Sequence, residues 1–218
     1  MIPRASRNLP EGYVHGGSIR LAGNRALYRR LTLVGLLLFP IGTVVLGALA
    51  ALVRPEGWTF GPVDTPVLLA VLILLVALAV TYVVTIVVHE AVHGLAIWAF
   101  TGARPVFGFK GFYAYADAPG WYLARGPMLT ALLAPLVLLP AIGLPVIALA
   151  PAGVSLLVFA GLVINTVGSA GDLYLSAVAV RVRGPVVFGD EPGAKPGEAG
   201  AWYVPAPLSS PGRQPVDE

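Results

Sequence analysis

The sequence predicts an all-α membrane protein with four transmembrane helices and a small cytoplasmic β-hairpin after the second. Hydrophobic residues make up 57% of its 218 residues and charged residues only 11%, whereas about 25% charged residues is usual in soluble domains. A helix needs about 20 apolar residues to cross the hydrocarbon core of a bilayer. Four apolar runs reach that length: residues 31–53, 65–100, 126–150 and 153–180.

The first apolar run follows thirty polar, Arg-rich residues and is longer than the apolar stretch of a cleaved signal, so we expect it to remain as a helix. Residues 1–30 are therefore interpreted as a basic cytoplasmic arm, and residues 31–183 as the membrane domain. Residues 184–218 are rich in Pro and Gly, a composition that buries too little apolar surface to fold alone. We expect this last segment to be a disordered tail.

The positions of the basic residues indicate which side of the membrane each loop faces. The loop at residues 54–64 holds one basic residue and two acids, and the turn at residues 151–153 holds no basic residue, whereas the other ends of the spans are basic. By the positive-inside rule, this distribution predicts a multi-pass protein of the plasma membrane with both termini in the cytoplasm. A nucleic-acid partner is not expected, because the basic residues follow the span ends and form no single patch. Those residues are Arg4, Arg7, Arg20, Arg25, Arg29, Arg30, Arg104, Lys110, Arg125, Arg181 and Arg183.

The second apolar run is longer than a bilayer requires. A helix over residues 66–100 would measure about 52 Å, so it must tilt or emerge from the membrane. Gly102 can end it in the left-handed conformation. Residues 105–116 alternate in a pattern typical of a small hairpin, with an interfacial aromatic belt as the alternative. The belt interpretation is favoured for Trp121 and Tyr122.

The third apolar run contains prolines at positions 127, 135, 140 and 145. A proline inside a helix lacks the amide hydrogen that would bond the carbonyl four residues earlier, and its ring crowds that carbonyl. A broken span and a merely bent one are both compatible with this pattern.

The segment TIVVHEAVHGL carries the main chemical signal of the sequence. His89 and His93 are four residues apart, so on a helix they share one face and can both bind one metal ion. Glu90 lies beside them, where it can act as general base on a zinc-activated water. The alternative is a buried cluster of hydrogen-bonded His and Glu side chains, which is costly to hold at membrane depth.

Two histidines leave a catalytic zinc site one protein ligand short. The chain has no cysteine, and its third histidine, His15, lies in the polar arm. Of the eleven acidic residues, only Glu90 and Asp172 fall inside the apolar runs. Asp172 is therefore the predicted third ligand, and its depth along the fourth run agrees with that of His93. Asp117, in the hairpin region, is the rival candidate.

Asn165 precedes Asp172 by seven residues, which is two helical turns. It is a candidate substrate-binding residue that could donate a hydrogen bond to a substrate carbonyl or to the developing oxyanion. A hydrogen bond between helices is the open alternative.

HEAVH in a membrane helix, a following aromatic hairpin and a later span with N-x6-D resemble the membrane proteins described as putative zincin peptidases. More distantly, they resemble the site-2 protease group of intramembrane metalloproteases. The resemblance covers about residues 66–183 and implies zinc-dependent peptide hydrolysis, with His89, His93 and Asp172 as ligands and Glu90 as the catalytic residue. The segment INTVGSAGD lacks the prolines of the site-2 signature N-x-x-P-x-P-x-x-D-G.

These observations favour a membrane-embedded zinc metallopeptidase that cuts a membrane-associated protein or peptide near the cytoplasmic face. A non-catalytic zinc-binding sensor would use the same ligands, but it would have no use for Glu90 as a base. An ion or proton transporter is a third interpretation, because transporters also place Asp, Glu and His inside the membrane. The four spans show no internal repeat, which disfavours the transporter.

Overall fold

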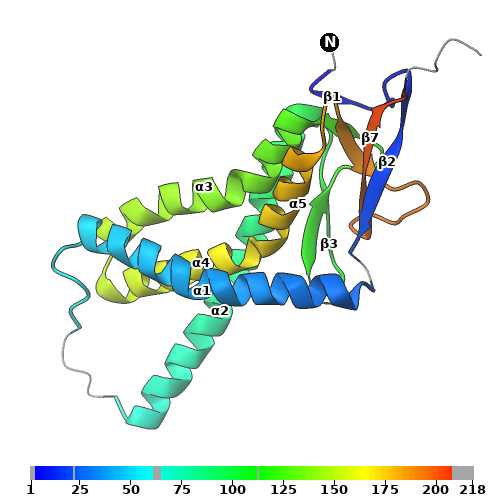
Figure 1. Cartoon of the computed structure of the whole chain (residues 1–218). Coiled ribbons are helices and arrows are strands. Elements are labelled where there is room, and N and C mark those ends of the chain that lie inside the picture. The colour runs from blue at the N-terminus through cyan, green and yellow to red at the C-terminus, as the bar shows by residue number, and fades with distance from the viewer. Residues whose placement is uncertain (1–2, 22, 61–64, 112, 208–218) are drawn as a thin grey trace, which may run out of the picture.

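The computed structural model describes residues 3–21, 23–60, 65–111 and 113–207. Its helices form a bundle, and its strands gather at one end of that bundle (Figure 1). The helices are α1 (Arg25–Val53), α2 (Val67–Thr101), α3 (Arg125–Leu149), α4 (Ala152–Gly168) and α5 (Ala170–Arg181). The strands are β1 (Ala5–Ser6), β2 (Tyr13–Arg20), β3 (Val106–Phe109), β4 (Ala114–Asp117), β5 (Tyr122–Ala124), β6 (Val187–Asp190) and β7 (Ala199–Pro205).

Three of these helices, α1, α2 and α3, are long and apolar enough to cross a bilayer. The fourth predicted span is not one helix, because α4 and α5 are separated at Ser169 and bent by 41°. The Ser169 hydroxyl donates to the carbonyl of Asn165 at 2.9 Å, and the neighbouring Gly168 and Gly171 lower helix propensity at the break. The bend leaves Asp172 in the first turn of α5.

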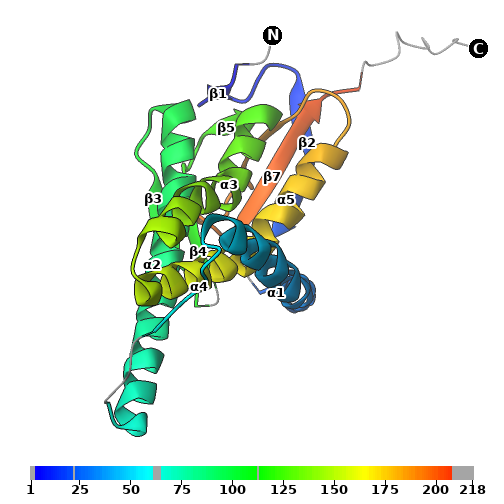
Figure 2. The ribbon, with the colours of Figure 1, turned by 90° about the vertical axis from the view of Figure 1, so that its left-hand side faces the viewer.

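Helix α2 is buried along its second half only. Its buried residues begin at Thr85, and the preceding turns extend away from the other helices (Figure 2). The helix ends at Gly102, whose φ of 66° is the left-handed cap conformation that the sequence predicts. At Gly94 a side chain would not fit, because a Cβ atom there would lie 2.5 Å from the ring of Phe107. Strand β3 can therefore pack closely on α2.

Helix α3 is continuous through Pro135, Pro140 and Pro145, so the third span is unbroken. Its C-terminal carbonyls are capped by Arg54, the one basic residue of the outer loop predicted at residues 54–64. The Arg54 guanidinium donates to the carbonyls of Ile147 and Ala150 at 3.0 and 2.7 Å. This capping role gives a structural reason for a basic residue at this end of the bundle.

The predicted hairpin region forms a two-stranded antiparallel sheet, with β3 paired to β4 and Val106 opposite Asp117. Whether this hairpin lies in the cytoplasm stays a prediction. Residue 112, which the sequence analysis included in the hairpin, lies outside the described residues.

A second sheet makes the all-α prediction incomplete. It is antiparallel, has the strand order β1-β5-β6-β7-β2, and joins strands from both ends of the chain. The prediction of a disordered tail is wrong for β6 and β7, while residues 208–218 lie outside the described residues. The tail has too little apolar surface to fold alone, but β6 and β7 pair with each other and with β5 and β2. The buried side chain of Phe188 packs with residues of α3 and α5.

The loop between β6 and β7 is bonded to the β3–β4 hairpin. Lys110 pairs with Glu198 at 3.1 Å, and the Tyr113 hydroxyl donates to the carbonyl of Gly197 at 2.6 Å. The amide of Gly197 in turn donates to the carboxylate of Asp117 at 3.1 Å. These contacts hold the hairpin between the terminal sheet and α2.

Candidate metal centre

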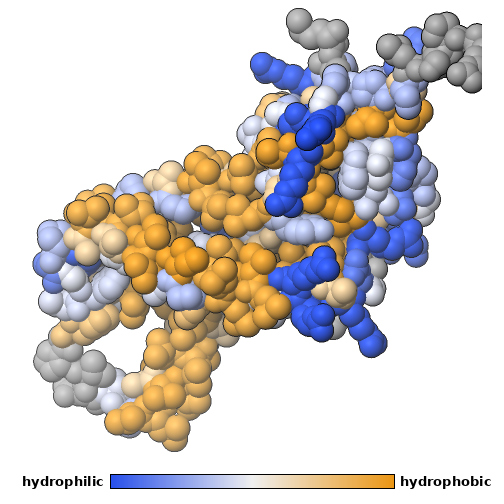
Figure 3. All heavy atoms as spheres, viewed as in Figure 1, coloured by the Kyte–Doolittle hydropathy of each residue, from blue (hydrophilic) through white to orange (hydrophobic). Residues whose placement is uncertain are grey.

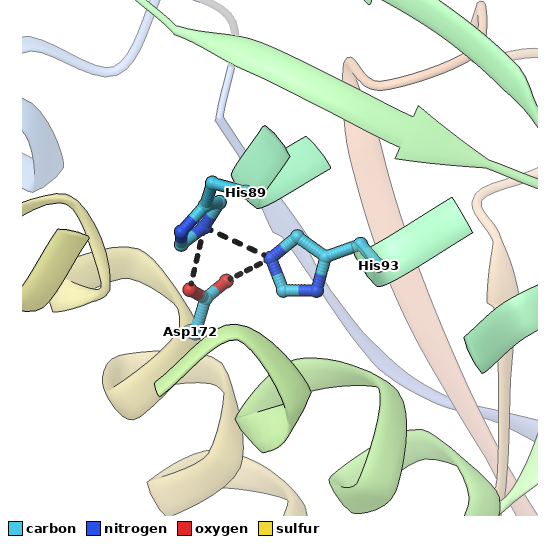
Figure 4. A group of neighbouring side chains, drawn as sticks. All are labelled: His89, His93 and Asp172. Atoms are coloured by element: carbon cyan, nitrogen blue, oxygen red, sulfur yellow. Dashed lines mark hydrogen bonds and ion pairs between the residues drawn. The ribbon is translucent and has the colours of Figure 1, made fainter. Parts of the chain in front are cut away.

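Three predicted ligand residues converge between α2 and α5 (Figure 4). His89 and His93 lie one helical turn apart on α2, with their Nε2 atoms 3.1 Å from each other. The carboxylate of Asp172 reaches both: Oδ2 lies 3.2 Å from Nε2 of His89, and Oδ1 lies 3.3 Å from Nε2 of His93. Asp172, the carboxylate that the sequence predicts from its depth, thus lies next to both histidines.

The other nitrogen of each imidazole ring faces a hydrogen-bond acceptor. Nδ1 of His93 lies 2.8 Å from the carbonyl of Ala131, and Nδ1 of His89 lies 2.8 Å from Oδ1 of Asn165. The amide group of Asn165 donates to the carbonyl of Pro135 at 3.2 Å, which fixes the orientation of that side chain. Both Nδ1 atoms must therefore carry the proton in the neutral ring, so both Nε2 lone pairs point into the cluster.

This arrangement fits a divalent cation. Two nitrogen lone pairs and a carboxylate meet in a buried space, and Oδ2 of Asp172 has no hydrogen-bond partner there. A tetrahedral zinc ion with bonds of about 2.0–2.1 Å requires ligand atoms about 3.3–3.4 Å apart. The two Nε2 atoms lie 3.1 Å apart, and each lies 3.2–3.3 Å from its nearer carboxylate oxygen, Oδ2 for His89 and Oδ1 for His93, which is close to this requirement. The donor set of two imidazoles and one carboxylate is one that zinc accepts.

Glu90 is half-buried and lines the same cavity as the three ligands. The backbone of Ala116 in β4 lies near its carboxylate. The cavity has a volume of about 1490 Å³ and is bordered by α1, α2, the hairpin, α4, α5 and the terminal sheet. Glu90 thus lies between the candidate metal ligands and the hairpin, in a space large enough for a peptide segment.

The side chain of Asn165 is engaged by neighbouring helices, and its role in substrate binding stays a prediction. It is 1% exposed, and both of its side-chain polar atoms bond to neighbouring helices. The spacing of two helical turns to Asp172 assumed one continuous helix, but α4 and α5 are bent by 41° at Ser169. The open alternative, a hydrogen bond between helices, is the one observed.

Asp117, the rival ligand, is bonded elsewhere. Its carboxylate accepts hydrogen bonds from the amides of Ala118 at 2.8 Å and Gly197 at 3.1 Å. His15 lies on β2, with its ring 5.8 Å from that of Tyr203. The structure therefore brings together His89, His93 and Asp172, and it leaves Asp117 and His15 outside the cluster.

Asp117 provides a prediction about stability. Burial raises the pKa of its carboxyl group, the nearby Asp190 charge adds to this, and the two amide donors oppose it. Above an ordinary aspartate pKa of about 4, the folded protein therefore binds more protons than the unfolded one, so stability should fall as pH rises through the raised pKa. Thermal unfolding of detergent-solubilised protein across this pH range should show that fall. In an Asp117→Asn variant, stability should fall less steeply with pH. An unchanged pH dependence would mean that another group causes the fall.

The sequence reasoning missed the carbonyl of Ala131 as a partner of His93. A signal for it is present, because Pro135 stands four residues later and lacks the amide that would otherwise occupy that carbonyl. Backbone groups carry no residue-type signature, so such a partner can be recognised only once the facing helix is known.

The long apolar helices and the buried His-His-Asp cluster beside a glutamate define a mainly helical protein with a candidate metal site. The comparison with protein families agrees: residues 82–184 match the family described as "Putative zincin peptidase". The match runs from the second half of α2 beyond the end of α5, a little under half of the chain, and includes all three candidate ligands and Glu90. Neither the curated proteins nor the solved structures gave a match.

Proposed function

We propose that this protein is a membrane-embedded zinc metallopeptidase that hydrolyses peptide bonds near the cytoplasmic face of the plasma membrane. The observation that carries the proposal is the convergence of two unprotonated imidazole nitrogens and one carboxylate beside Glu90. The family described as "Putative zincin peptidase" supports the same chemistry.

His89, His93 and Asp172 would hold the zinc ion, which would polarise the scissile carbonyl and activate a water molecule. The carboxylate of Glu90 would take a proton from that water and later pass it to the amine of the leaving peptide. The backbone carbonyl of Ala131 and the side-chain Oδ1 of Asn165 orient His93 and His89, respectively, by accepting from their Nδ1–H groups. Each of these steps of peptide hydrolysis thus has a residue with suitable chemistry.

A protein or peptide substrate would bind in extended form along β4. Among the described residues, β4 pairs with β3 on one edge only, and the backbone of Ala116 lies close to Glu90. An extended segment added to the other edge would form backbone hydrogen bonds and pass next to the candidate metal site. Tyr113 and Asp117 contact Gly197, in the loop between β6 and β7, next to this edge. That loop would therefore have to leave room for the substrate.

The helices would lie in a lipid bilayer. Apolar side chains cover the helical part of the molecule, and hydrophilic ones gather near the strands (Figure 3). The first turns of α2 expose Val67, Leu68 and Leu72 by half or more, which would be unfavourable in water but suits contact with lipid.

The proposed orientation can be tested by labelling. Strands β2 and β7 lie in one sheet, so the segments leading to both termini lie at the same end of the bundle. We expect single cysteines at Ser6 and Ser209 to be protected from an impermeant thiol reagent on intact cells, and one at Thr59 to react. Reaction at both Ser6 and Ser209, with protection at Thr59, would reverse the orientation. Reaction at Ser209 alone would require an odd number of spans.

The proposed cofactor can be tested on purified protein. We expect about one zinc ion per chain by elemental analysis, and loss of peptide hydrolysis when a chelator removes it. Restoring zinc should restore the activity. A purified, folded protein that neither contains nor takes up zinc would contradict the proposal, while zinc binding without hydrolysis would favour a zinc-binding sensor.

A further inference from the structure

We propose that Pro135 and Asn165 are positioning residues that set the tautomers of the two histidines before a metal ion binds. The inference rests on the proposed zinc site, but it concerns contacts made by the protein alone. Each residue secures an acceptor for one Nδ1–H group, and neither lies among the three candidate ligands.

Pro135 acts through the backbone of α3. In a regular helix, the amide of residue 135 would donate to the carbonyl of Ala131. Proline has no amide hydrogen, and α3 nevertheless continues through this position, so the carbonyl loses its intrahelical partner. Nδ1 of His93 lies 2.8 Å from that carbonyl. The proline therefore frees the acceptor that His93 uses, and His93 in turn satisfies a buried carbonyl.

Asn165 acts through its side chain. Its Oδ1 atom accepts from Nδ1 of His89 at 2.8 Å, and its amide donates to the carbonyl of Pro135 at 3.2 Å. If the side chain flipped, an NH₂ group would face Nδ1, and the proton of His89 would have to move to Nε2. The bond to Pro135 opposes that flip. The two positioning residues thus form one unit across α3 and α4.

The consequence is an apo site already arranged for a cation. A histidine binds a metal through an unprotonated nitrogen, and the hydrogen bond at the other nitrogen decides which one that is. Partners of this kind typically change metal affinity by about 10–100-fold when they are removed. We expect a loss of zinc affinity of the same size when either Pro135 or Asn165 is replaced.

Replacing Pro135 tests the first contact, with two other prolines as matched controls. A Pro135→Ala variant restores an amide that competes with His93 for the carbonyl of Ala131. Pro140→Ala and Pro145→Ala also restore one helical amide each, but they act on the carbonyls of Leu136 and Ala141, which neither histidine Nδ1 uses. We expect zinc affinity, measured by competition with a chromogenic chelator, to fall about 10–100-fold for Pro135→Ala and to change less than threefold for the controls. Equal losses in all three would overturn the proposal.

Replacing Asn165 tests the second contact. Asn165→Asp keeps an oxygen acceptor facing His89, whereas Asn165→Leu removes it at similar volume. We expect the aspartate variant to retain zinc affinity within about threefold and the leucine variant to lose about 10–100-fold. Equal affinities in the two variants would contradict a positioning role for Asn165.

A measurement on zinc-free protein separates this inference from the proposed function. Side-chain nitrogen-15 shifts of His89 and His93 report which ring nitrogen carries the proton. We expect Nδ1–H for both in the parent protein, Nε2–H to appear at His93 in Pro135→Ala, and Nε2–H to appear at His89 in Asn165→Leu. Unchanged tautomers in these variants would overturn the inference even if zinc binds. If the parent protein binds no zinc but shows the expected tautomers, the inference about Pro135 and Asn165 stands and the proposed function fails.

Discussion

A Glu90→Gln variant is expected to keep its zinc and to lose peptide hydrolysis by about 10²–10⁴-fold, the contribution typical of a general base. The amide has nearly the same size as the carboxylate but cannot take a proton from water. Glu90 lies outside the cluster of three ligand atoms, so its replacement should not weaken metal binding. The measurement is zinc content and the rate of cleavage of a membrane-associated peptide substrate, each compared with the parent protein.

The zinc content makes the result interpretable. If the variant retains zinc and the thermal stability of the parent but cleaves slowly, the substitution has impaired the catalytic step and has left the fold intact. If Glu90→Gln cleaves as fast as the parent, the proposed peptidase mechanism is wrong. If the parent binds zinc but cleaves no peptide at all, the non-catalytic sensor becomes the better interpretation, because Glu90 has no role in binding alone.

The core of the candidate site was accessible to sequence reasoning because its signals are local or few. The spacing of His89 and His93 is a property of any helix, and Asp172 was found because so few charged residues interrupt the apolar runs. The elimination rests on the expectation that a carboxylate at membrane depth is costly without a partner.

The role of Asn165 was not accessible in the same way. Its inferred position assumed that one helix continues through residue 169, whereas Ser169 ends α4 and α5 begins in a new direction. A run of apolar residues does not report a bend of this kind, because both halves remain apolar. Its contact with His89 joins two helices, and the spacing to Asp172 could not indicate it.

The terminal sheet was missed for a different reason. Strand β7 pairs with β2 from the other end of the chain, with Tyr13 opposite Pro205. Composition measures whether a segment can fold alone, and by that measure the tail cannot. Composition cannot show that β7 pairs with a strand almost 200 residues earlier in the chain. The alternating burial of β7 is nevertheless a typical strand pattern.

Replacing the third candidate ligand should have the largest effect on metal binding. Asp172→Ala removes the carboxylate that, among the described residues, reaches both Nε2 atoms, and it leaves two imidazoles to hold the ion. Even the loss of a residue that only hydrogen-bonds to a metal ligand typically lowers metal affinity by about 10–100-fold. We therefore expect zinc occupancy after purification to fall by more than tenfold. An equilibrium measurement with a chelator should show the same loss in affinity.

Asp117→Ala is the matched control, because it also removes a buried carboxylate near the hairpin. Its two hydrogen-bond partners are the amides of Ala118 and Gly197, so the hairpin contact should weaken while zinc occupancy stays close to that of the parent. Thermal unfolding separates the two effects, since a less stable but fully loaded Asp117→Ala protein is the expected result. The reverse pattern, with zinc lost on replacing Asp117 and kept on replacing Asp172, would move the metal site from α5 to the hairpin.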